Sequence, residues 1–153
     1  TAGFSEKHAC CFEDCKDVIA KAVTLAHPKD DTMFCLFVDA SKDHWGIMLT
    51  QTDPEMLKKR DIADQGHEPL AFLSGTFRGA QQRWAIIEKE AFPIMEATIR
   101  LKHFLLRDKG FTIFTDHRNL VYIFDPERRA VNEAKHTSDR LERWTWRLSP
   151  FGT

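Results

Sequence analysis

The sequence predicts an α/β fold in which a mixed β-sheet carries helices on its faces. The apolar run at residues 34–39 indicates a buried strand, and a second strand at residues 45–51 follows so closely that the two form an antiparallel hairpin. A long amphipathic helix then separates this hairpin from a strand at residues 111–116. Because a helix connects them, the strand at 111–116 can join the sheet beside the first strand and parallel to it.

The first half of the chain supplies a helix and three strands. From Ser5 to about Leu25, apolar residues recur at helical spacing, and Ser5 can cap the helix. The polar stretch at residues 52–66 is expected to be a loop with one weak helical turn. A third strand at residues 68–77 follows it, and it extends the antiparallel part of the sheet.

The second half of the chain is mainly helical. A stripe of apolar residues from Trp84 to Leu106 predicts one long helix, and Pro93 within it should remove a hydrogen bond to the Lys89 carbonyl and kink the helix or delay its start. After the fourth strand, the pattern predicts a short helix at residues 119–124, a polar linker and a final helix. The linker and the final helix occupy residues 125–136 and 138–149.

The composition is that of one soluble globular domain. The chain has 153 residues, of which 42% are hydrophobic and 29% charged, and no apolar run reaches the length of a membrane span. We expect an N-terminal helix in residues 1–30 and the domain itself in residues 31–153. The net charge of −1 provides no overall field that attracts nucleic acid, so a local patch or metal ions would have to hold a polyanion.

The cysteines do not form the spaced framework of a small secreted protein. Three of the four are crowded at Cys10, Cys11 and Cys15, and we expect all four to be reduced. Cys11 and Cys15 with His8 could in principle form a zinc face. No second pair of ligands stands at a matching spacing, so buried free thiols are the favoured interpretation.

Two carboxylates stand at the ends of neighbouring strands. Asp39 and Asp116 each follow an apolar run, and ligand sites in open α/β sheets gather at the carboxyl ends of the strands. Glu88 or Glu90 on the long helix could reach the same place. Such acids repel one another unless a cation lies among them, and oxygen ligands favour Mg²⁺ or Mn²⁺. The alternative is that Asp39 caps a turn and Asp116 caps a helix.

Five ordered motifs resemble the ribonuclease H domain of gypsy-type LTR-retroelement reverse transcriptases. They are DASxxxxG at 39–46, HEPLAFLSGTF at 67–77, QRWxxxEKE at 82–90, FTIFTDHRNL at 111–120 and RWxxxLSPF at 143–151. The resemblance implies a metal-dependent nuclease that hydrolyses the RNA strand of an RNA/DNA hybrid. By motif position it makes Asp39, Glu90 and Asp116 the catalytic and metal-binding acids. Glu90 is preferred because Ala91 and Phe92 follow it as in the family, which leaves Glu88 as a solvated helix residue.

The sequence departs from the family pattern at its C-terminal end. The family uses a fourth acid on a terminal helix beyond a fifth strand, and only 37 residues (153 minus 116) follow Asp116 here. We therefore expect the fifth strand and the fourth carboxylate to be missing and the activity to be weakened or lost. Asp139 and Glu142 are the nearest acids, but the motifs place them on the preceding helix. His44 stands where the family usually has glycine.

Two functions remain open from the sequence. The first is a retroelement ribonuclease H domain that acts inside the cell, in the cytoplasm or in the retroelement particle, on an RNA/DNA hybrid with Mg²⁺ or Mn²⁺. The alternative is a catalytically silent, co-opted copy that binds a protein partner, for example as a secreted effector. Neither function involves a membrane. The basic and aromatic residues near the C-terminus could contact nucleic acid or form an ordinary solvated helix with a tryptophan core face; they are Arg128, Arg129, Lys135, Arg140, Arg143, Arg147, Trp144 and Trp146.

Overall fold

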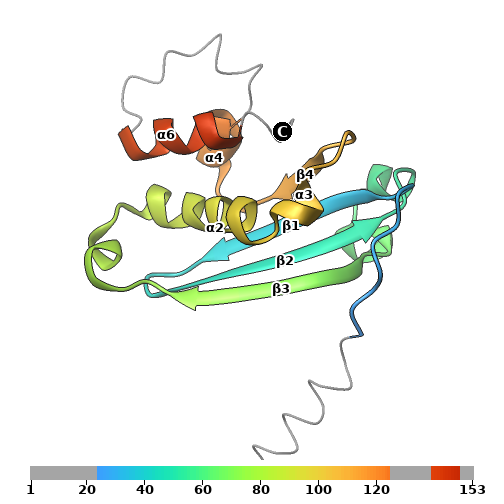
Figure 1. Cartoon of the computed structure of the whole chain (residues 1–153), viewed down its shortest axis with the longest axis horizontal. Coiled ribbons are helices and arrows are strands. Elements are labelled where there is room, and N and C mark those ends of the chain that lie inside the picture. The colour runs from blue at the N-terminus through green and yellow to red at the C-terminus, as the bar shows by residue number, and fades with distance from the viewer. Residues whose placement is uncertain (1–23, 125–138, 149–153) are drawn as a thin grey trace, which may run out of the picture.

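A four-stranded mixed sheet forms the centre of the molecule in the computed structural model, which describes residues 24–124 and 139–148 (Figure 1). Its strands are β1 (Met33–Ala40), β2 (His44–Thr52), β3 (Glu68–Thr76) and β4 (Phe111–Phe114). They lie in the order β3-β2-β1-β4; β1 pairs antiparallel with β2 and parallel with β4, and β2 pairs antiparallel with β3. The predicted mixed sheet is therefore confirmed, with four strands in the described part of the chain.

The alternation of side chains along β1 explains why the sheet has one covered face. Leu36 pairs with Leu49 of β2, and both are fully buried in the core. Phe37, the next residue of β1, points to the opposite face, where it pairs with Met48 and stacks on Phe114 with a ring separation of 4.5 Å. The described helices pack on the Leu36 face, whereas Phe37 on the opposite face is only partly buried among the described residues.

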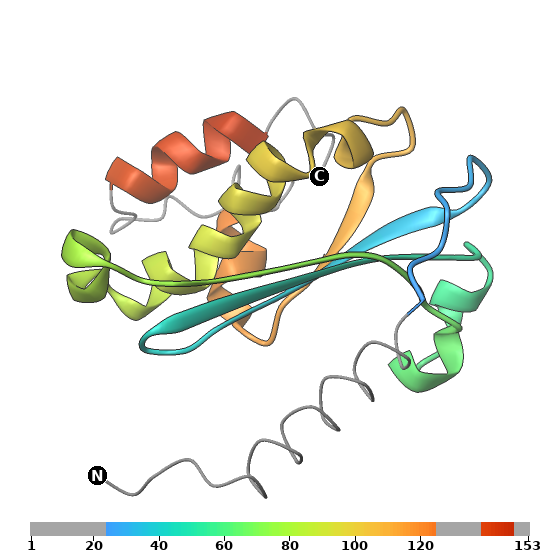
Figure 2. The same cartoon turned by 60° about the horizontal axis from the view of Figure 1, so that its bottom comes forward.

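The helices lie together on one side of the sheet (Figures 1 and 2). They are α2 (Ile86–Arg100), α3 (Lys102–Leu105), α4 (Arg118–Phe124) and α6 (Asp139–Leu148). Helix α2 contacts β1 and β2, and α6 contacts α2 and α4. Ile94 of α2, Leu120 of α4 and Leu141 of α6 are almost completely buried at these contacts, which join the helices to the sheet in one core.

The long helix differs from its sequence prediction at both ends. A 3₁₀ turn, η3 (Gly79–Arg83), precedes it, α2 begins at Ile86, and the backbone leaves the helical conformation at Leu101, so the expected single helix becomes α2 and α3. Pro93 does not delay the start, because it lies buried in the interior of α2. Leu101 itself is buried in the core cluster at this break between α2 and α3.

The loop after β2 contains two 3₁₀ turns, η1 (Met56–Lys58) and η2 (Ile62–Gln65), where the sequence predicts one weak turn. Asp61 accepts a hydrogen bond from the Ala63 amide and so caps η2. The predicted N-terminal helix and the polar linker 125–136 lie outside the described residues, as do Cys10, Cys11 and Cys15. Within the described part of the chain, no helix is long and apolar enough to cross a membrane.

Candidate metal centre

The parallel pairing of β1 and β4 brings Asp39 and Asp116 to the same edge of the sheet. Phe37 of β1 is in register with Phe114 of β4, and each aspartate follows two residues later. Because parallel strands advance equally per residue, the two carboxylates leave the sheet at the same level. Both side chains are exposed at this edge. Asp39 pairs with Gly46 of β2, where the neighbouring strand carries no side chain.

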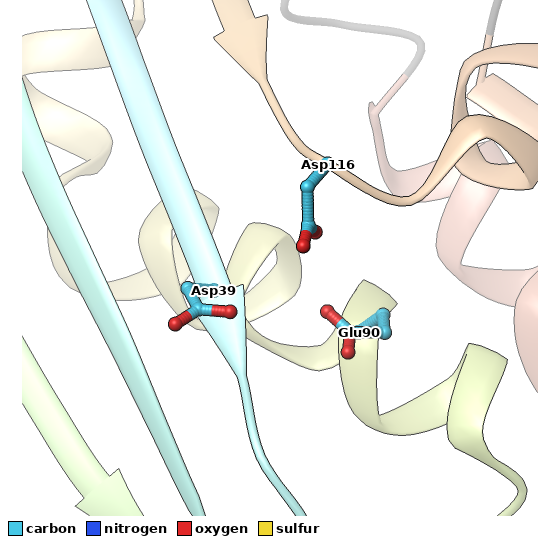
Figure 3. Close-up of side chains that lie close together, drawn as sticks. All are labelled: Asp39, Glu90 and Asp116. Carbon is cyan, nitrogen blue, oxygen red and sulfur yellow. The ribbon is translucent and has the colours of Figure 1, made fainter.

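Helix α2 brings a third carboxylate to this edge. One oxygen of each of Asp39, Glu90 and Asp116 lies within 4.8 Å of the other two (Figure 3). The three side chains come from β1, α2 and the loop after β4, and all point toward a common centre. Within residues 24–124 and 139–148, no fourth acid joins this cluster. Its donors are all carboxylate oxygens, the ligand type preferred by hard divalent cations.

Glu88 is not a solvated helix residue, so that expectation is wrong. It is only 8% exposed, and its carboxylate forms an ion pair of 2.8 Å with Arg140 of α6. Its Oε2 also accepts a hydrogen bond of 3.1 Å from the Ala85 amide at the start of α2. Residues two positions apart in an α-helix, such as Glu88 and Glu90, point about 200° apart around its axis. Glu88 therefore faces α6, while Glu90 faces the sheet edge.

The environment of Glu90 disfavours its charged form in the absence of a cation. Burial raises the pKa of the Glu90 carboxyl, and the negative charges of Asp116 and Asp39 raise it further. The charge of His117 and a hydrogen bond from the Ala40 amide lower it in part. In addition, Glu90 Oε2 is buried and has no hydrogen-bond partner within residues 24–124 and 139–148. A buried acceptor of this kind beside two further carboxylates fits a bound divalent ion.

Replacement of Glu90 by Gln is expected to stabilise the metal-free protein near neutral pH. Below the ordinary pKa of about 4.5, the carboxyl is protonated in both the folded and unfolded states. As the pH rises above that value, the unfolded state releases its proton first, because the folded-state pKa is raised, and the wild type loses stability. The amide of the Glu90→Gln variant does not titrate, so the variant keeps its stability over this pH range.

Urea unfolding in the presence of EDTA at pH 4 and pH 7 tests this expectation. The difference between Glu90→Gln and the wild type should be larger at pH 7 than at pH 4. A variant that is less stable than the wild type at pH 7 would show that the carboxylate has a structural partner.

Lys89, which precedes Glu90 on α2, holds the turn that follows Asp39. Lys89 is only 7% exposed, and its Nζ donates hydrogen bonds to the carbonyl of Lys42 at 2.7 Å and to that of Gln82 at 3.0 Å. Its ammonium group also lies 5.4 Å from the centre of the Phe77 ring. These contacts tie the β1–β2 turn to the start of α2 and so hold the end of β1 in place.

One side of α6 packs against α2 and the segment before it, so the side chains on that side are occupied by contacts within the protein. The Arg140 guanidinium stacks over the Trp84 ring at 4.4 Å in addition to its ion pair with Glu88. The Trp144 ring lies 5.8 Å from that of Trp84. For these residues the interpretation as a helix with a tryptophan core face is correct, whereas Trp146 is 72% exposed. Arg128, Arg129 and Lys135 lie outside the described residues.

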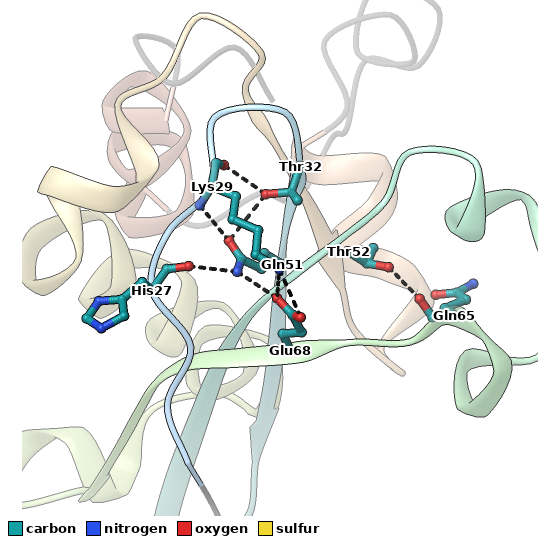
Figure 4. A network of polar contacts seen from close by, with 7 residues as sticks. All are labelled: His27, Lys29, Thr32, Gln51, Thr52, Gln65 and Glu68. Carbon is teal, nitrogen blue, oxygen red and sulfur yellow. Dashed lines mark hydrogen bonds and ion pairs between the residues drawn. The ribbon is translucent and has the colours of Figure 1, made fainter.

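A second polar cluster lies at the opposite end of β1 and β2, and no sequence pattern indicated it (Figure 4). Its centre is Gln51, which is fully buried. Gln51 Oε1 accepts hydrogen bonds from the Lys29 amide at 2.9 Å and the Thr32 hydroxyl at 3.2 Å, and its Nε2 donates to the His27 carbonyl and a Glu68 carboxylate oxygen, both at 2.9 Å. Because its donors and acceptors are matched, this cluster is a structural connection between the chain before β1 and the sheet.

Residues 29–151 match the family model described as the RNase H-like domain found in reverse transcriptase. The chain belongs to this family. The predicted family and fold are thereby confirmed, and the five motifs that carry the resemblance lie wholly within the matched residues.

The RNase H-like domain is similar in sequence to retrotransposon polyproteins of insects and yeast. It is 31% identical over 140 residues to the retrovirus-related Pol polyprotein from transposon 297 and 32% identical over 133 residues to that from transposon 412, both of Drosophila melanogaster. It is 29% identical over 141 residues to the transposon Tf2-3 polyprotein of Schizosaccharomyces pombe. These alignments cover 92%, 86% and 92% of the chain. The chain spans 10% to 11% of the length of these relatives.

The RNase H-like domain is similar in structure to parts of the foamy viral protease-reverse transcriptase. A structure of that protein in complex with dsDNA matches with a TM-score of 0.62 at 14% identity, over 94% of this chain and 28% of the other. A second structure, titled as the dRH form in complex with ds DNA, matches with a TM-score of 0.60 at 15% identity, over 97% of this chain and 25% of the other. These matches support the fold. None of the comparisons favours the alternative function as a protein-binding module.

Proposed function

We propose that the domain hydrolyses the RNA strand of an RNA/DNA hybrid with the aid of Mg²⁺ or Mn²⁺ held by Asp39, Glu90 and Asp116. The observation that carries this proposal is the convergence of three carboxylates, from β1, α2 and the end of β4, in a chain of the RNase H-like family. The proximity of these three carboxylates supports the same residues that the sequence motifs indicate as ligands of a shared cation. The ion pair of Glu88 with Arg140 supports Glu90 as the acid contributed by α2.

The three residues have different surroundings, which suggest different tasks. Glu90 is half-buried on helix α2 and provides the least exposed carboxylate of the site. Asp39 and Asp116 are exposed, so a phosphodiester can approach from their side. When bound, divalent ions supply the activation of a water nucleophile and the neutralisation of the charge that develops on the phosphate.

Among the described residues, a groove lies beside the acids on the Phe37 face of the sheet. Asp39 and Asp116 line one part of it, and the apolar side chains of Phe37, Met48 and Phe72 line another. Its volume is about 900 Å³. A nucleic-acid strand that approaches the carboxylates would therefore meet apolar and aromatic surface next to them, which favours base or sugar contacts over phosphate contacts there.

We further propose residues 31–153 as the functional domain, with residues 1–30 as the segment that leads into it. Ala26 donates a backbone hydrogen bond of 2.7 Å to the Pro69 carbonyl, and Lys29 forms an ion pair of 2.8 Å with Glu68, so the end of that segment is attached to β3. Action on a retroelement hybrid places the domain inside the cell, in the cytoplasm or in a retroelement particle.

Cleavage of a labelled hybrid tests the proposed function. We expect the full chain to cut the RNA strand of an RNA/DNA hybrid in the presence of Mg²⁺ or Mn²⁺ and to stop when EDTA is added. Single-stranded RNA, duplex RNA and duplex DNA of the same sequence serve as controls and should be cut much more slowly. A hybrid that stays intact with Mn²⁺ and stoichiometric protein would overturn the proposal.

A further inference from the structure

Two buried polar atoms lack a hydrogen-bond partner among the side chains that the structure describes. They are Glu90 Oε2 and His117 Nδ1. The first is an acceptor, and the second can carry a proton and donate it. Buried polar groups are almost always paired, so two complementary exceptions in one small region call for a common explanation. His117 directly follows Asp116 in the sequence, so both exceptions belong to the surroundings of the carboxylate cluster.

The backbone holds His117 in a fixed place beside the cluster. Its amide donates a hydrogen bond of 3.2 Å to the Thr115 hydroxyl, and its carbonyl accepts one of 3.0 Å from the Leu120 amide in the first turn of α4. The side chain is half-buried. His117 directly follows Asp116, whose nearest carboxylate oxygen lies within 4.8 Å of an oxygen of Glu90. The imidazole therefore belongs to the immediate surroundings of the Glu90 carboxyl, and its charge lowers the pKa of that group.

We propose that His117 is a positioning residue for Glu90, whose Oε2 it holds by donating the Nδ1 proton to one bridging water. This inference rests on the proposed function, because the purpose of the contact is to aim the Glu90 carboxylate at a divalent ion. His117 does not itself contact the ion or the substrate in this arrangement. Loss of such an outer partner of a metal-binding carboxylate typically weakens metal affinity about 10- to 100-fold.

Substitutions at His117 can distinguish the contribution of Nδ1 from that of Nε2. The amide nitrogen of Asn reaches the place of imidazole Nδ1, whereas that of the longer Gln side chain reaches the place of Nε2. We therefore expect His117→Ala and His117→Gln to raise the Kd for Mn²⁺ about 10- to 100-fold, and His117→Asn to retain most of the affinity. His103→Ala, which removes an exposed imidazole on α3, is the matched control and should bind Mn²⁺ like the wild type.

Mn²⁺ binding measured by electron paramagnetic resonance on the full chain provides the first readout. In the cleavage assay, saturating Mn²⁺ should restore the kcat of His117→Ala, because the defect lies in ion binding. Equal Kd values for the wild type and all three His117 variants would overturn the inference and leave the proposed function intact. A His117→Asn variant as weak as His117→Ala would also overturn it, since the donor at Nδ1 would then be irrelevant.

A metal-free measurement distinguishes failure of the inference from failure of the proposed function. The unfolding free energies of His117→Ala, Glu90→Gln and the double variant, all in EDTA, form a double-mutant cycle. Non-additive changes support the His117–Glu90 contact, and additive changes overturn it. If the wild type binds no Mn²⁺, the proposed function fails, and this cycle alone decides whether the two side chains interact.

Discussion

Replacement of Asp39 by Asn is expected to reduce hybrid cleavage on the order of 10²- to 10⁴-fold. The amide has nearly the same size as the carboxylate but no charge, so it is a poor ligand for Mg²⁺ or Mn²⁺. In the described part of the chain, the cluster contains no further acid that could take its place. Since Asp39 is exposed at the end of β1, the substitution should leave the core unchanged.

Single-turnover cleavage rates of the folded variant test this expectation, together with Asp108→Asn as the matched control. Asp108 is exposed in the loop before β4, at the opposite end of this strand from Asp116, and undergoes the same change of charge. The control should cleave like the wild type. If Asp39→Asn cleaves as fast as Asp108→Asn, the carboxylate cluster is not the catalytic centre.

Replacement of Gln51 by Leu is expected to reduce the free energy of unfolding by about 2–4 kcal/mol. Leucine fits the volume but leaves the Lys29 amide, the His27 carbonyl and one Glu68 oxygen without the partner they have in the wild type. Each lost hydrogen bond contributes a net of about 0.5–1.5 kcal/mol, because these partners are only partly buried and water can replace Gln51 in part. The segment before β1 would then lose its main attachment to the sheet.

Urea unfolding of the metal-free protein measures this loss, with Gln82→Leu as the control. Gln82 is exposed before α2, so the same chemical change there removes no buried partner. Equal stability changes in the two variants would show that the Gln51 hydrogen bonds make no net contribution. Hybrid cleavage by Gln51→Leu at low temperature should stay near the wild-type rate, because Gln51 lies at the far end of β2 from the carboxylates.

The fold and the three carboxylates were predictable because each depends on local patterns and chain connectivity. An apolar run that ends in an acid specified Asp39 and Asp116, and the helix between the strands specified their parallel pairing. The position of both acids two residues beyond a paired phenylalanine follows directly from that register. The family motif then distinguished Glu90 from Glu88, a choice that the helix pattern alone left open.

The environment of Glu88 was not predictable from its own segment. It looked like a solvated helix residue because its partner, Arg140, lies on α6 and becomes a neighbour only through the packing of α6 on α2. The same reason applies to Gln51, whose partners come from the segment before β1 and from β3. Likewise, nothing in the letters TDHR indicates that His117 Nδ1 is buried without a hydrogen-bond partner among the described residues. Contacts of this kind depend on tertiary structure, which periodicity does not encode.

The short length of β4 means that an ion bound by the carboxylate cluster would also affect the stability of this strand. β4 has four residues and pairs only with β1 in the described part of the sheet, so few hydrogen bonds hold it. Short border strands open more readily than central ones. An ion shared by Asp39, Glu90 and Asp116 would bridge this weakly held strand to the central strand and to α2. Metal binding would therefore stabilise the pairing of β4 with β1, so that the edge of the sheet becomes rigid when the ion needed for cleavage is bound.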